Sequence, residues 1–316
     1  MTKRKNQILG SIIVFGYFCV RLFYFASMRI AFDAKRLYNN FTGLGNHSRT
    51  TIDILTEHFP DNEYVLFTPR VGREPVTAAY LQKPLCRTVT PRGLTGGSLW
   101  RTFRMAREVN DMGADLFHGL SNELPVGLDV PSVVTIHDVA FRTFPDMYRW
   151  HDRLIYDQKW RYACRHADRI IAISECTKRD VMRFYGVDES KIDVVYQPVN
   201  PIYYDDTVTI DDRRSQQREP FMLYVGSFNS RKKLLGVVKA IELLPTSLRI
   251  PLVVVGDGGE YKRRVVEYAD NHGLSDMVRF VGSVKSLSEL RDYYLRATLF
   301  CYPSFYEGFG LPVVES

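Results

Sequence analysis

The sequence predicts an α/β protein of two domains, each built around a parallel sheet with helices on both faces. A chain of 316 residues is long for one hydrophobic core. Short Val/Ile-rich runs bounded by turn residues alternate with longer segments of helical spacing, which is typical of buried parallel strands and their crossover helices. The alternation stops at a polar stretch, residues 200–219, and then begins again, so this stretch is the expected linker.

The first expected domain covers residues 28–199. A glycine-bearing turn, residues 38–50, separates its first strand from its first helix. The predicted strands are RIAFDA (29–34), EYVLFT (63–68), ADLFHG (114–119), PSVVTIHD (131–138), DRIIAIS (168–174) and IDVVYQP (192–198). The clearest helices are TTIDILTEHF (50–59), YDQKWRYACRHA (156–167) and CTKRDVMRFYG (176–186).

The second expected domain covers residues 220–316 and repeats the pattern. Its predicted strands are FMLYVGS (221–227), PLVVVGDG (251–258), VRFVGS (278–283) and TLFCYPS (298–304). Its helices are KLLGVVKAIELLP (233–245), EYKRRVVEYADNHG (260–273) and SLSELRDYYLRA (286–297). Ligands in folds of this kind bind beyond the carboxyl ends of the strands, so candidate residues are sought there.

The first 27 residues need a separate interpretation. A basic start is followed by an apolar run from Ile8 to Ala26 that approaches the length needed to cross a bilayer. One interpretation is a signal anchor with its basic end inside. The other is a mis-assigned leader, with translation beginning at Met28, just before the first strand.

Charge and cysteine content limit the partners and the compartment. The net charge of +6 and the pI of about 9.0 suit nucleotide diphosphates, acidic lipid head groups or nucleic acid, and also an ordinary basic surface. The five cysteines are scattered and form no CxxC motif, so no zinc or redox signature is present. A reducing compartment is the simplest fit.

Two kinds of residue stand at strand ends of the first domain. Gly43 and Gly45 would let backbone amides approach an anion at a helix start, or they form an ordinary turn. His118 and His137, the latter followed by Asp138, end two strands. They either reach a ligand or are buried histidines bonded to the backbone.

Basic residues follow the first strand of the second domain. That strand ends at Gly226, and Arg231 and Lys232 precede the next helix. Cations beside a helix start suit a diphosphate, although a solvated basic patch is the alternative. The glycines of VVVGDGGE lack the spacing of a dinucleotide fingerprint and predict a plain turn.

The final stretch, FYEGFGLPVVES, carries two acids around a turn. Gly310 lets the turn approach a ligand, and Pro312 stands at an expected helix start. Glu307 then lies in the loop and Glu315 in the first helical turn. The acids can accept hydrogen bonds from hydroxyls, and the amides between them can donate to anionic oxygen. A ligand with both groups is a sugar nucleotide.

Taken together, these motifs resemble those of glycosyltransferase family 4, the retaining GT-B enzymes. The most specific is the E-x7-E pair of Glu307 and Glu315; YVGSFNSRKKL, VVTIHDVAFRTFP, DLFHG and ADRIIAISECTKRDV follow the family's order from about Met28 to Ser316. The resemblance implies a GT-B fold, with two Rossmann-like domains facing across a cleft. It also favours Met28 as the start.

The resemblance implies roles for the matched residues. Glu315 would bind the ribose hydroxyls of the donor nucleotide, and Glu307 the hydroxyls of the transferred sugar. Lys233 stands where many relatives have asparagine and receives no role. The amides around Phe309 and Gly310 would bind the sugar or phosphate, and Lys232 with Arg231 would neutralise the diphosphate. The remaining implied roles are a place at the catalytic centre for His137, close approach of Gly43 and Gly45 to the phosphates or the reacting sugar, and lining of the cleft by His118 and Asp138.

The function implied is sugar transfer with retention, from a nucleotide-diphosphate sugar to a saccharide or lipid-linked saccharide, in bacterial surface polysaccharide synthesis. No D-x-D pair ends a strand, so we expect neither a metal nor another cofactor. We expect a cytoplasmic protein, at the inner membrane face if the aromatic stretch 141–156 contacts lipid rather than packing inside. No nucleic-acid motif is present.

Three alternatives remain. A non-catalytic nucleotide-sugar-binding protein or a nucleotide-sugar epimerase would use the same kind of fold. In the family, the helix bearing the second glutamate continues further, so we also expect the second domain to be incomplete and the chain to be a truncated or degenerate fragment.

Overall fold

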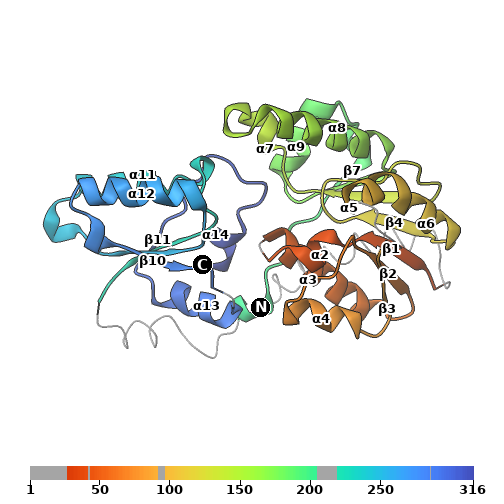
Figure 1. Ribbon diagram of the computed structural model, residues 1–316, viewed down its shortest axis with the longest axis horizontal. Helices are drawn as coiled ribbons and strands as arrows, with labels where there is room; N and C mark the ends of the chain where they lie inside the picture. The colour runs from red at the N-terminus through yellow and green to blue at the C-terminus, as the bar shows by residue number, and fades with distance from the viewer. Residues whose placement is uncertain (1–26, 42, 92–96, 205–218, 285) are drawn as a thin grey trace. The chain divides into compact units, whose positions relative to one another are not determined.

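The computed structural model describes residues 27–41, 43–91, 97–204, 219–284 and 286–316. In these residues the protein has two parallel sheets with helices on both faces, which confirms the α/β class (Figure 1). The described residues up to Pro198 form one compact unit, and those from Val199 form a second. The expected leader lies outside the described residues except for residue 27, as does the expected linker from residue 205 to residue 218.

The first unit contains a sheet of seven described strands in the order β3-β2-β1-β4-β5-β6-β7, and every pairing is parallel. The strand order changes direction between β1 and β4, which is where ligands bind in folds of this kind. The elements are β1 (Arg29–Asp33), α2 (Lys35–Asn39), α3 (Gly43–His58), β2 (Glu63–Phe67), α4 (Pro75–Leu81), β3 (Cys86–Val89), α5 (Gly97–Leu99), the π-helix η1 (Trp100–Arg104), α6 (Met105–Asp111), β4 (Leu116–Gly119), β5 (Ser132–Ile136), α7 (Ala140–Thr143), η2 (Pro145–Met147), α8 (Trp150–His166), β6 (Arg169–Ala172), α9 (Glu175–Tyr185), η3 (Glu189–Lys191) and β7 (Ile192–Val194).

Each face of this sheet has its own core. One face packs against α6, α8 and α9 through side chains such as Val109, Trp160 and Val181. The other packs against α2, α3 and α4 through Leu37, Ile52 and Tyr80 among others. Burial on both faces explains why the strands are continuous apolar runs rather than alternating ones.

The helix that follows β6 shows how local sequence sets an element's ends. The Ser174 side chain accepts a hydrogen bond from the Thr177 amide at 3.0 Å, which caps the start of α9. Gly186, with φ of 64°, ends it in the left-handed conformation.

The turn predicted for residues 38–50 is wrong in part. Residues from Gly43 onward already form the first turns of α3, and the short helix α2 lies directly after β1. An ordinary turn was inferred because glycines disfavour helices, but Gly45 is needed here for close packing: a Cβ there would lie 1.7 Å from the Asn40 carbonyl oxygen.

The second unit contains a sheet of four described strands in the order β10-β9-β8-β11, again all parallel. Here the order changes direction between β8 and β11. Its elements are η4 (Pro201–Tyr204), β8 (Met222–Val225), η5 (Ser230–Lys232), α11 (Leu234–Leu243), η6 (Thr246–Leu248), β9 (Leu252–Val255), α12 (Gly259–Asn271), η7 (Ser275–Met277), β10 (Val278–Gly282), α13 (Leu287–Arg296), β11 (Leu299–Phe300) and α14 (Leu311–Glu315).

The cores of the second unit also divide by face. α11 and α12 cover one face, with Val238 and Val265 in its core, and α13 covers the other through Tyr294 (Figure 1). No helix in the described ranges has the length and apolar character that crossing a bilayer requires.

Two adjacent strands of this sheet come very close where they end. Gly256 follows β9 with φ of 134°, and a Cβ on it would lie 2.0 Å from the carbonyl oxygen of Gly226, which follows β8. Only glycine at position 256 therefore allows the backbone at Gly226, just after β8, to lie this close to the end of β9.

We predict that Gly256→Ala lowers the free energy of unfolding of the second unit by about 1–3 kcal/mol, because the backbone must shift to accept the methyl group. Gly259→Ala is the matched control, since nothing lies within 4 Å of a Cβ at that position in α12. Urea denaturation followed by circular dichroism measures both variants. Equal stability of the two would contradict the packing argument.

Candidate functional site

The basic loop after β8 is held in one tight turn. The Asn229 side chain accepts a hydrogen bond from the Lys232 amide at 3.1 Å and caps the 3₁₀ turn η5. Lys233 then adopts φ of 53°, which lets α11 begin at Leu234. Arg231 and Lys232 are thus fixed between the carboxyl end of β8 and the start of α11.

The loop after β11 brings Glu307 to these cations. One carboxylate oxygen of Glu307 lies 3.1 Å from Arg231 Nη1 and 2.9 Å from Lys232 Nζ. β11 pairs with β8, so the loops that follow these two strands meet at the point where the strand order changes direction. The structure therefore brings together Arg231, Lys232 and Glu307, three residues singled out from sequence.

Further hydrogen bonds hold the two loops together. The Phe305 amide donates to the Arg231 carbonyl at 3.0 Å, and the Arg231 guanidinium donates to the carbonyl oxygen of Tyr306. Lys232 Nζ donates to the hydroxyl of Tyr302 at 2.6 Å. Tyr302 was not predicted from sequence, because nothing in CYPS distinguishes a ligand-side tyrosine from a core one.

The cluster carries a net positive charge. Burial acts to raise the pKa of the Glu307 carboxyl, but the nearby charges of Lys232 and Arg231 outweigh it and hold that pKa below its ordinary value. Glu307 is therefore ionised at neutral pH. Two cations against one carboxylate in a partly buried place attract an anion.

Glu315 has a different set of neighbours. Gly310, with φ of 82°, stands at the start of α14, and Glu315 is the last residue of this short helix. The Tyr294 hydroxyl of α13 donates to Glu315 Oε2 at 3.2 Å, and burial raises the pKa of the Glu315 carboxyl. Sequence reasoning missed Tyr294, since it lies in an ordinary amphipathic helix.

Phe309 and Gly310 lie, half-buried, in the segment that joins Glu307 to α14. Gly226 directly follows β8 with φ of 152°, and a Cβ at that position would be in ordinary contact with Lys232, 3.6 Å from its Cδ. These placements put the predicted ligand residues of the second unit on the loops after β8 and β11.

In the first unit, His137 follows β5 and is buried. Its Nε2 lies 2.9 Å from the carbonyl oxygen of Leu120, which can only accept, so Nε2 carries the proton. Nδ1 then accepts from Gln197 Nε2 at 3.0 Å. Burial, with a smaller contribution from the charge of Arg36, lowers the pKa of His137 to about 4.

His118 is buried as well, with its Nε2 2.9 Å from Thr135 Oγ1, and burial lowers its pKa to about 3. The His47 ring from α3 meets the His137 ring edge-on, with 4.8 Å between ring centroids. His47 was missed because the sequence reads as a turn there. The three neutral rings line the carboxyl edge of the sheet.

Gly43, Gly45 and Asp138 lie near this edge. The Gly45 amide donates to Asn40 Oδ1 at 2.9 Å, while Gly43 is exposed at the start of α3. Asp138 Oδ1 accepts from the Ala140 amide at 3.1 Å, and its carbonyl accepts from Trp160 at 3.0 Å. Asp138 thus shapes the turn into α7.

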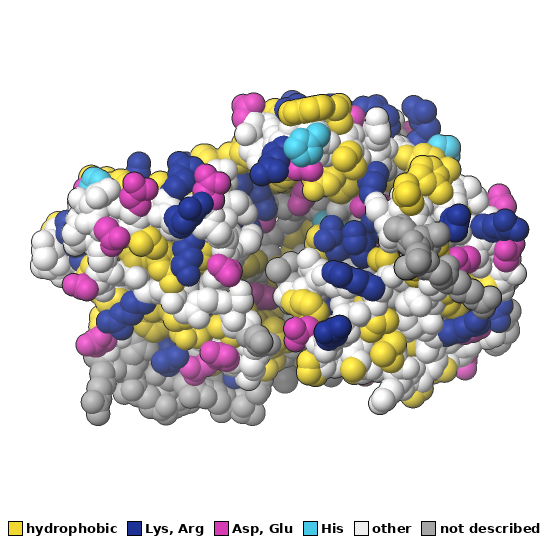
Figure 2. All heavy atoms as spheres, in the orientation of Figure 1, with side chains coloured by type: hydrophobic (Ala, Val, Ile, Leu, Met, Phe, Trp, Pro, Cys, Tyr) yellow, Lys and Arg dark blue, Asp and Glu magenta, His cyan; other side chains and the backbone are white. Residues whose placement is uncertain are grey.

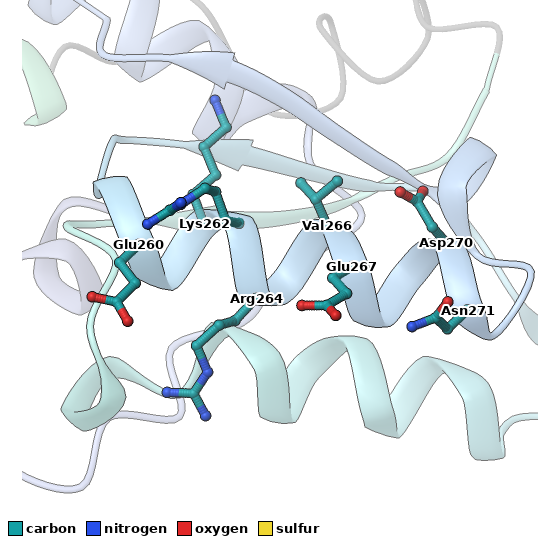
Figure 3. Close-up of a pocket in the computed structure, with 8 residues that line it drawn as sticks. Glu260, Lys262, Arg264, Val266, Glu267, Asp270 and Asn271 are labelled. Carbon is teal, nitrogen blue, oxygen red and sulfur yellow. The ribbon is translucent and has the colours of Figure 1, made fainter.

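A surface hollow lies elsewhere, along α12 of the second unit. Its lining includes Glu260, Arg264, Glu267 and Asp270, none of which was predicted as a site residue (Figure 3). Within the described ranges no three or more His, Cys, Asp or Glu side chains gather as a metal would require.

Family models match both parts of the chain. The model of Glycosyltransferase Family 4 matches residues 43–202, and that of Glycosyl transferases group 1 matches residues 206–316. The chain is 28% identical over 223 residues to O-antigen chain mannosyltransferase B of Escherichia coli, a match that covers 67% of this chain and 57% of that one. It spans about half the length of the curated relatives it matches.

Solved structures share the fold. WaaG, a glycosyltransferase involved in lipopolysaccharide biosynthesis, gives a TM-score of 0.68 at 18% identity, over 90% of this chain and 78% of that one. HepE of Anabaena in complex with UDP-glucose gives 0.65 at 17%, over 91% and 77%. These likenesses confirm the predicted GT-B fold class.

The buried histidines make the first unit sensitive to acid. In the folded state the pKa values of His118 and His137 are about 3 and 4, against 6.5 in an exposed chain. Their contribution to stability is therefore complete above pH 6.5, and the free energy of unfolding falls as the pH drops from there towards 4. Tryptophan fluorescence during urea denaturation reports on this unit, because all three tryptophans lie in it.

We expect His118→Gln to make this pH dependence shallower, because the variant has no imidazole at position 118 to take up a proton while His137 remains. His151→Gln, at an exposed position in α8, is the control and should keep the slope. A free energy of unfolding that is constant from pH 6.5 to pH 4.5 would contradict the assignment of buried, neutral rings.

Proposed function

Because the chain belongs to glycosyltransferase family 4, we propose that it transfers a hexosyl group from a nucleoside diphosphate sugar to a saccharide or lipid-linked saccharide, in bacterial surface polysaccharide synthesis. The observation that carries this proposal is the cluster of Arg231, Lys232 and Glu307 between the loops after β8 and β11. The printed names of the relatives, an O-antigen mannosyltransferase among them, support the same class of acceptor.

The cations would stabilise the leaving group. When the bond between the sugar and the diphosphate breaks, negative charge develops on the diphosphate oxygens. Arg231 and Lys232 are already fixed by the turn and by Glu307, so they would need little reorganisation to receive that charge. We propose that this neutralisation proceeds without a metal.

The two acids would hold hydroxyl groups of the donor. Glu307 is ionised and would accept hydrogen bonds from the transferred sugar. Glu315 has one oxygen bonded by Tyr294 and would use the other for the ribose. Backbone amides near Phe309 and Gly310 would complete the donor contacts, and the Gly226 backbone would lie beside Lys232.

His137 would serve the catalytic centre as a neutral group. Both of its ring nitrogens are hydrogen-bonded and its pKa is about 4, so it carries no charge at neutral pH. We assign it a positioning role next to the sugar, with Gly43 and Gly45 at the adjacent helix start. In the proposed retaining reaction the acceptor oxygen attacks from the face that the diphosphate leaves, and a diphosphate oxygen takes the acceptor's proton.

Two other functions would use the same site. A binding protein would hold the nucleotide sugar without reaction, and an epimerase would convert it without an acceptor. Incubating the purified chain with labelled donors, with and without saccharide acceptors, separates the three. Transfer that requires an acceptor supports our proposal, whereas donor conversion without one supports the epimerase and binding alone supports the binding protein.

We predict that Lys232→Gln weakens binding of the preferred nucleoside diphosphate by about tenfold or more, because a charge-assisted contact is lost. Glu307→Gln should instead leave the affinity for nucleoside diphosphate within about threefold and reduce binding of the nucleotide sugar, because it contacts the sugar. Calorimetric titration with uridine and guanosine diphosphates and their sugars measures both effects.

Arg264→Gln is the matched control for this experiment. Arg264 is a cation of the same unit that lines the hollow on α12 (Figure 3). Its replacement should leave nucleotide binding unchanged. If Arg264→Gln and Lys232→Gln lost equal affinity for the nucleotide, binding would depend only on the net positive charge of the unit. That result would contradict the assigned site.

The outer face of α8 suits contact with an anionic membrane. Trp150, Leu154 and Ile155 are 71%, 55% and 50% exposed, although Phe141 and Trp160 of the same region pack inside. Figure 2 shows hydrophobic, basic and histidine side chains in this region, with a few acidic side chains between them. The most exposed residues of α8 are Trp150, His151, Leu154, Ile155, Gln158, Arg161, Arg165 and His166, and an acid beside them, Asp152, has a 42% exposed side chain 3.6 Å from His151 Nε2.

This surface would bring a cytoplasmic enzyme to a lipid-linked acceptor. We predict that the double variant Trp150→Ser, Leu154→Ser loses most of its co-sedimentation with vesicles that contain anionic phosphatidylglycerol. Leu243→Ser, which removes an 85% exposed leucine from the second unit, should bind as the unaltered chain does. Equal binding of the double variant and the unaltered chain would exclude α8 as the contact.

A further inference from the structure

A group of charged residues gathers at the carboxyl end of β1, where the strand order of the first sheet changes direction. Asp33 ends β1, and Lys35 and Arg36 begin α2 directly after it. Arg101 reaches the same place from the π-helix η1, and Glu123 from the segment after β4. In parallel α/β folds, ligands bind beyond the carboxyl ends of the strands where the strand order changes direction, which is where these charges lie.

The two acids of this group already have cationic partners. Arg101 lies 2.6 Å from Asp33 Oδ2 and 2.8 Å from Glu123 Oε2. Lys159 of α8 also lies 2.7 Å from Glu123 Oε2. Asp33 and Arg101 are both buried, so this network is a fixed part of the fold.

Two further cations of this group, Lys35 and Arg36, have no such ion pair within the described residues. The side chains of Lys35 and Arg36 are half-buried, and neither makes a hydrogen bond or ion pair with any residue that the structure describes. Burial and the charges of Arg101 and Arg36 lower the pKa of Lys35, and the opposing charges of Glu123 and Asp33 offset this only in part. An anion bound there would relieve both effects.

The same cations lie near the predicted catalytic centre. The charge of Arg36 contributes to the lowered pKa of His137, so the guanidinium lies close enough to act on that ring. His137 follows β5, two strands away from β1 in the sheet. An anion held by Lys35 and Arg36 would therefore lie at the carboxyl edge of the first sheet, the edge that also bears His137.

We propose that Lys35 and Arg36 bind a phosphate group of the acceptor, so that the enzyme uses a phosphorylated saccharide rather than a neutral one. This inference rests on the proposed function, but it concerns the first unit alone. Arg101, held by Asp33 and Glu123, would stiffen the site and keep it positive, while the two unmatched cations make the contacts. The phosphate could belong to a free sugar phosphate or to the diphosphate of a lipid-linked saccharide.

The test compares matched ligands on the full chain. Calorimetric titration with mannose 1-phosphate, mannose 6-phosphate and mannose measures the contribution of the phosphate. A mannosyl lipid diphosphate in neutral detergent micelles, compared with the same lipid without phosphate, tests the other source. We expect at least one phosphorylated ligand to bind about tenfold or more tightly than its neutral counterpart.

Variants locate the phosphate. Lys35→Gln and Arg36→Gln should each remove most of this preference, and Lys35→Arg should retain it. Lys178→Gln is the control, because this cation of the same unit has its own partner, Glu189, at 2.7 Å. Thermal unfolding checks that each variant is folded. The preference of the unaltered chain for phosphorylated over neutral ligands tests the inference even if a variant does not fold.

Lys232→Gln separates this inference from the proposed function. It should weaken nucleoside diphosphate binding and leave the preference for a phosphorylated acceptor in place. If the preference is lost in Lys232→Gln and kept in Lys35→Gln, the phosphate belongs to the donor site and our inference is overturned. Equal binding of phosphorylated and neutral ligands to the unaltered chain overturns it as well.

Discussion

The ion pairs of Glu307 with Arg231 and Lys232 are the interaction on which the second unit's site depends. They join the loops after β8 and β11, and they give two partly buried cations an anionic partner while no ligand is present. Leaving such cations unpaired would be costly. In the proposed reaction, a diphosphate would enter a site whose cations are already in place, and Glu307 would then turn towards the sugar.

Much of the fold was predictable because burial on both faces marks parallel strands clearly. β3 was missed since it is a short strand at the sheet edge whose residues are only half-buried, so no apolar run identifies it. The start of α3 was misread because Gly43 and Gly45 suggest a turn, whereas close packing against Asn40 is what requires glycine at position 45. Such packing between segments is not visible in local sequence.

The candidate site was predictable where motifs carry it and not elsewhere. Arg231, Lys232 and Glu307 follow strands and precede helices, so their meeting could be expected from topology. Tyr294, Tyr302 and His47 have no local signature, because each acts through a neighbour that is distant in sequence. The hydrogen bonds that set the tautomer of His137 depend on Leu120 and Gln197, which only the folded chain brings to it.

The close approach of Gly226 and Gly256 also limits how the proposed donor site can be redesigned. Changing the sugar or base that an enzyme accepts commonly begins with randomising residues next to the ligand. At position 256 any side chain would collide with the backbone of Gly226, so substitutions there would shift the chain and lower stability. Diversity is better placed at Ser227, Ser230, Pro303 and Phe305, which are exposed on the loops after β8 and β11, than at the buried Phe228 or at Asn229, which caps η5.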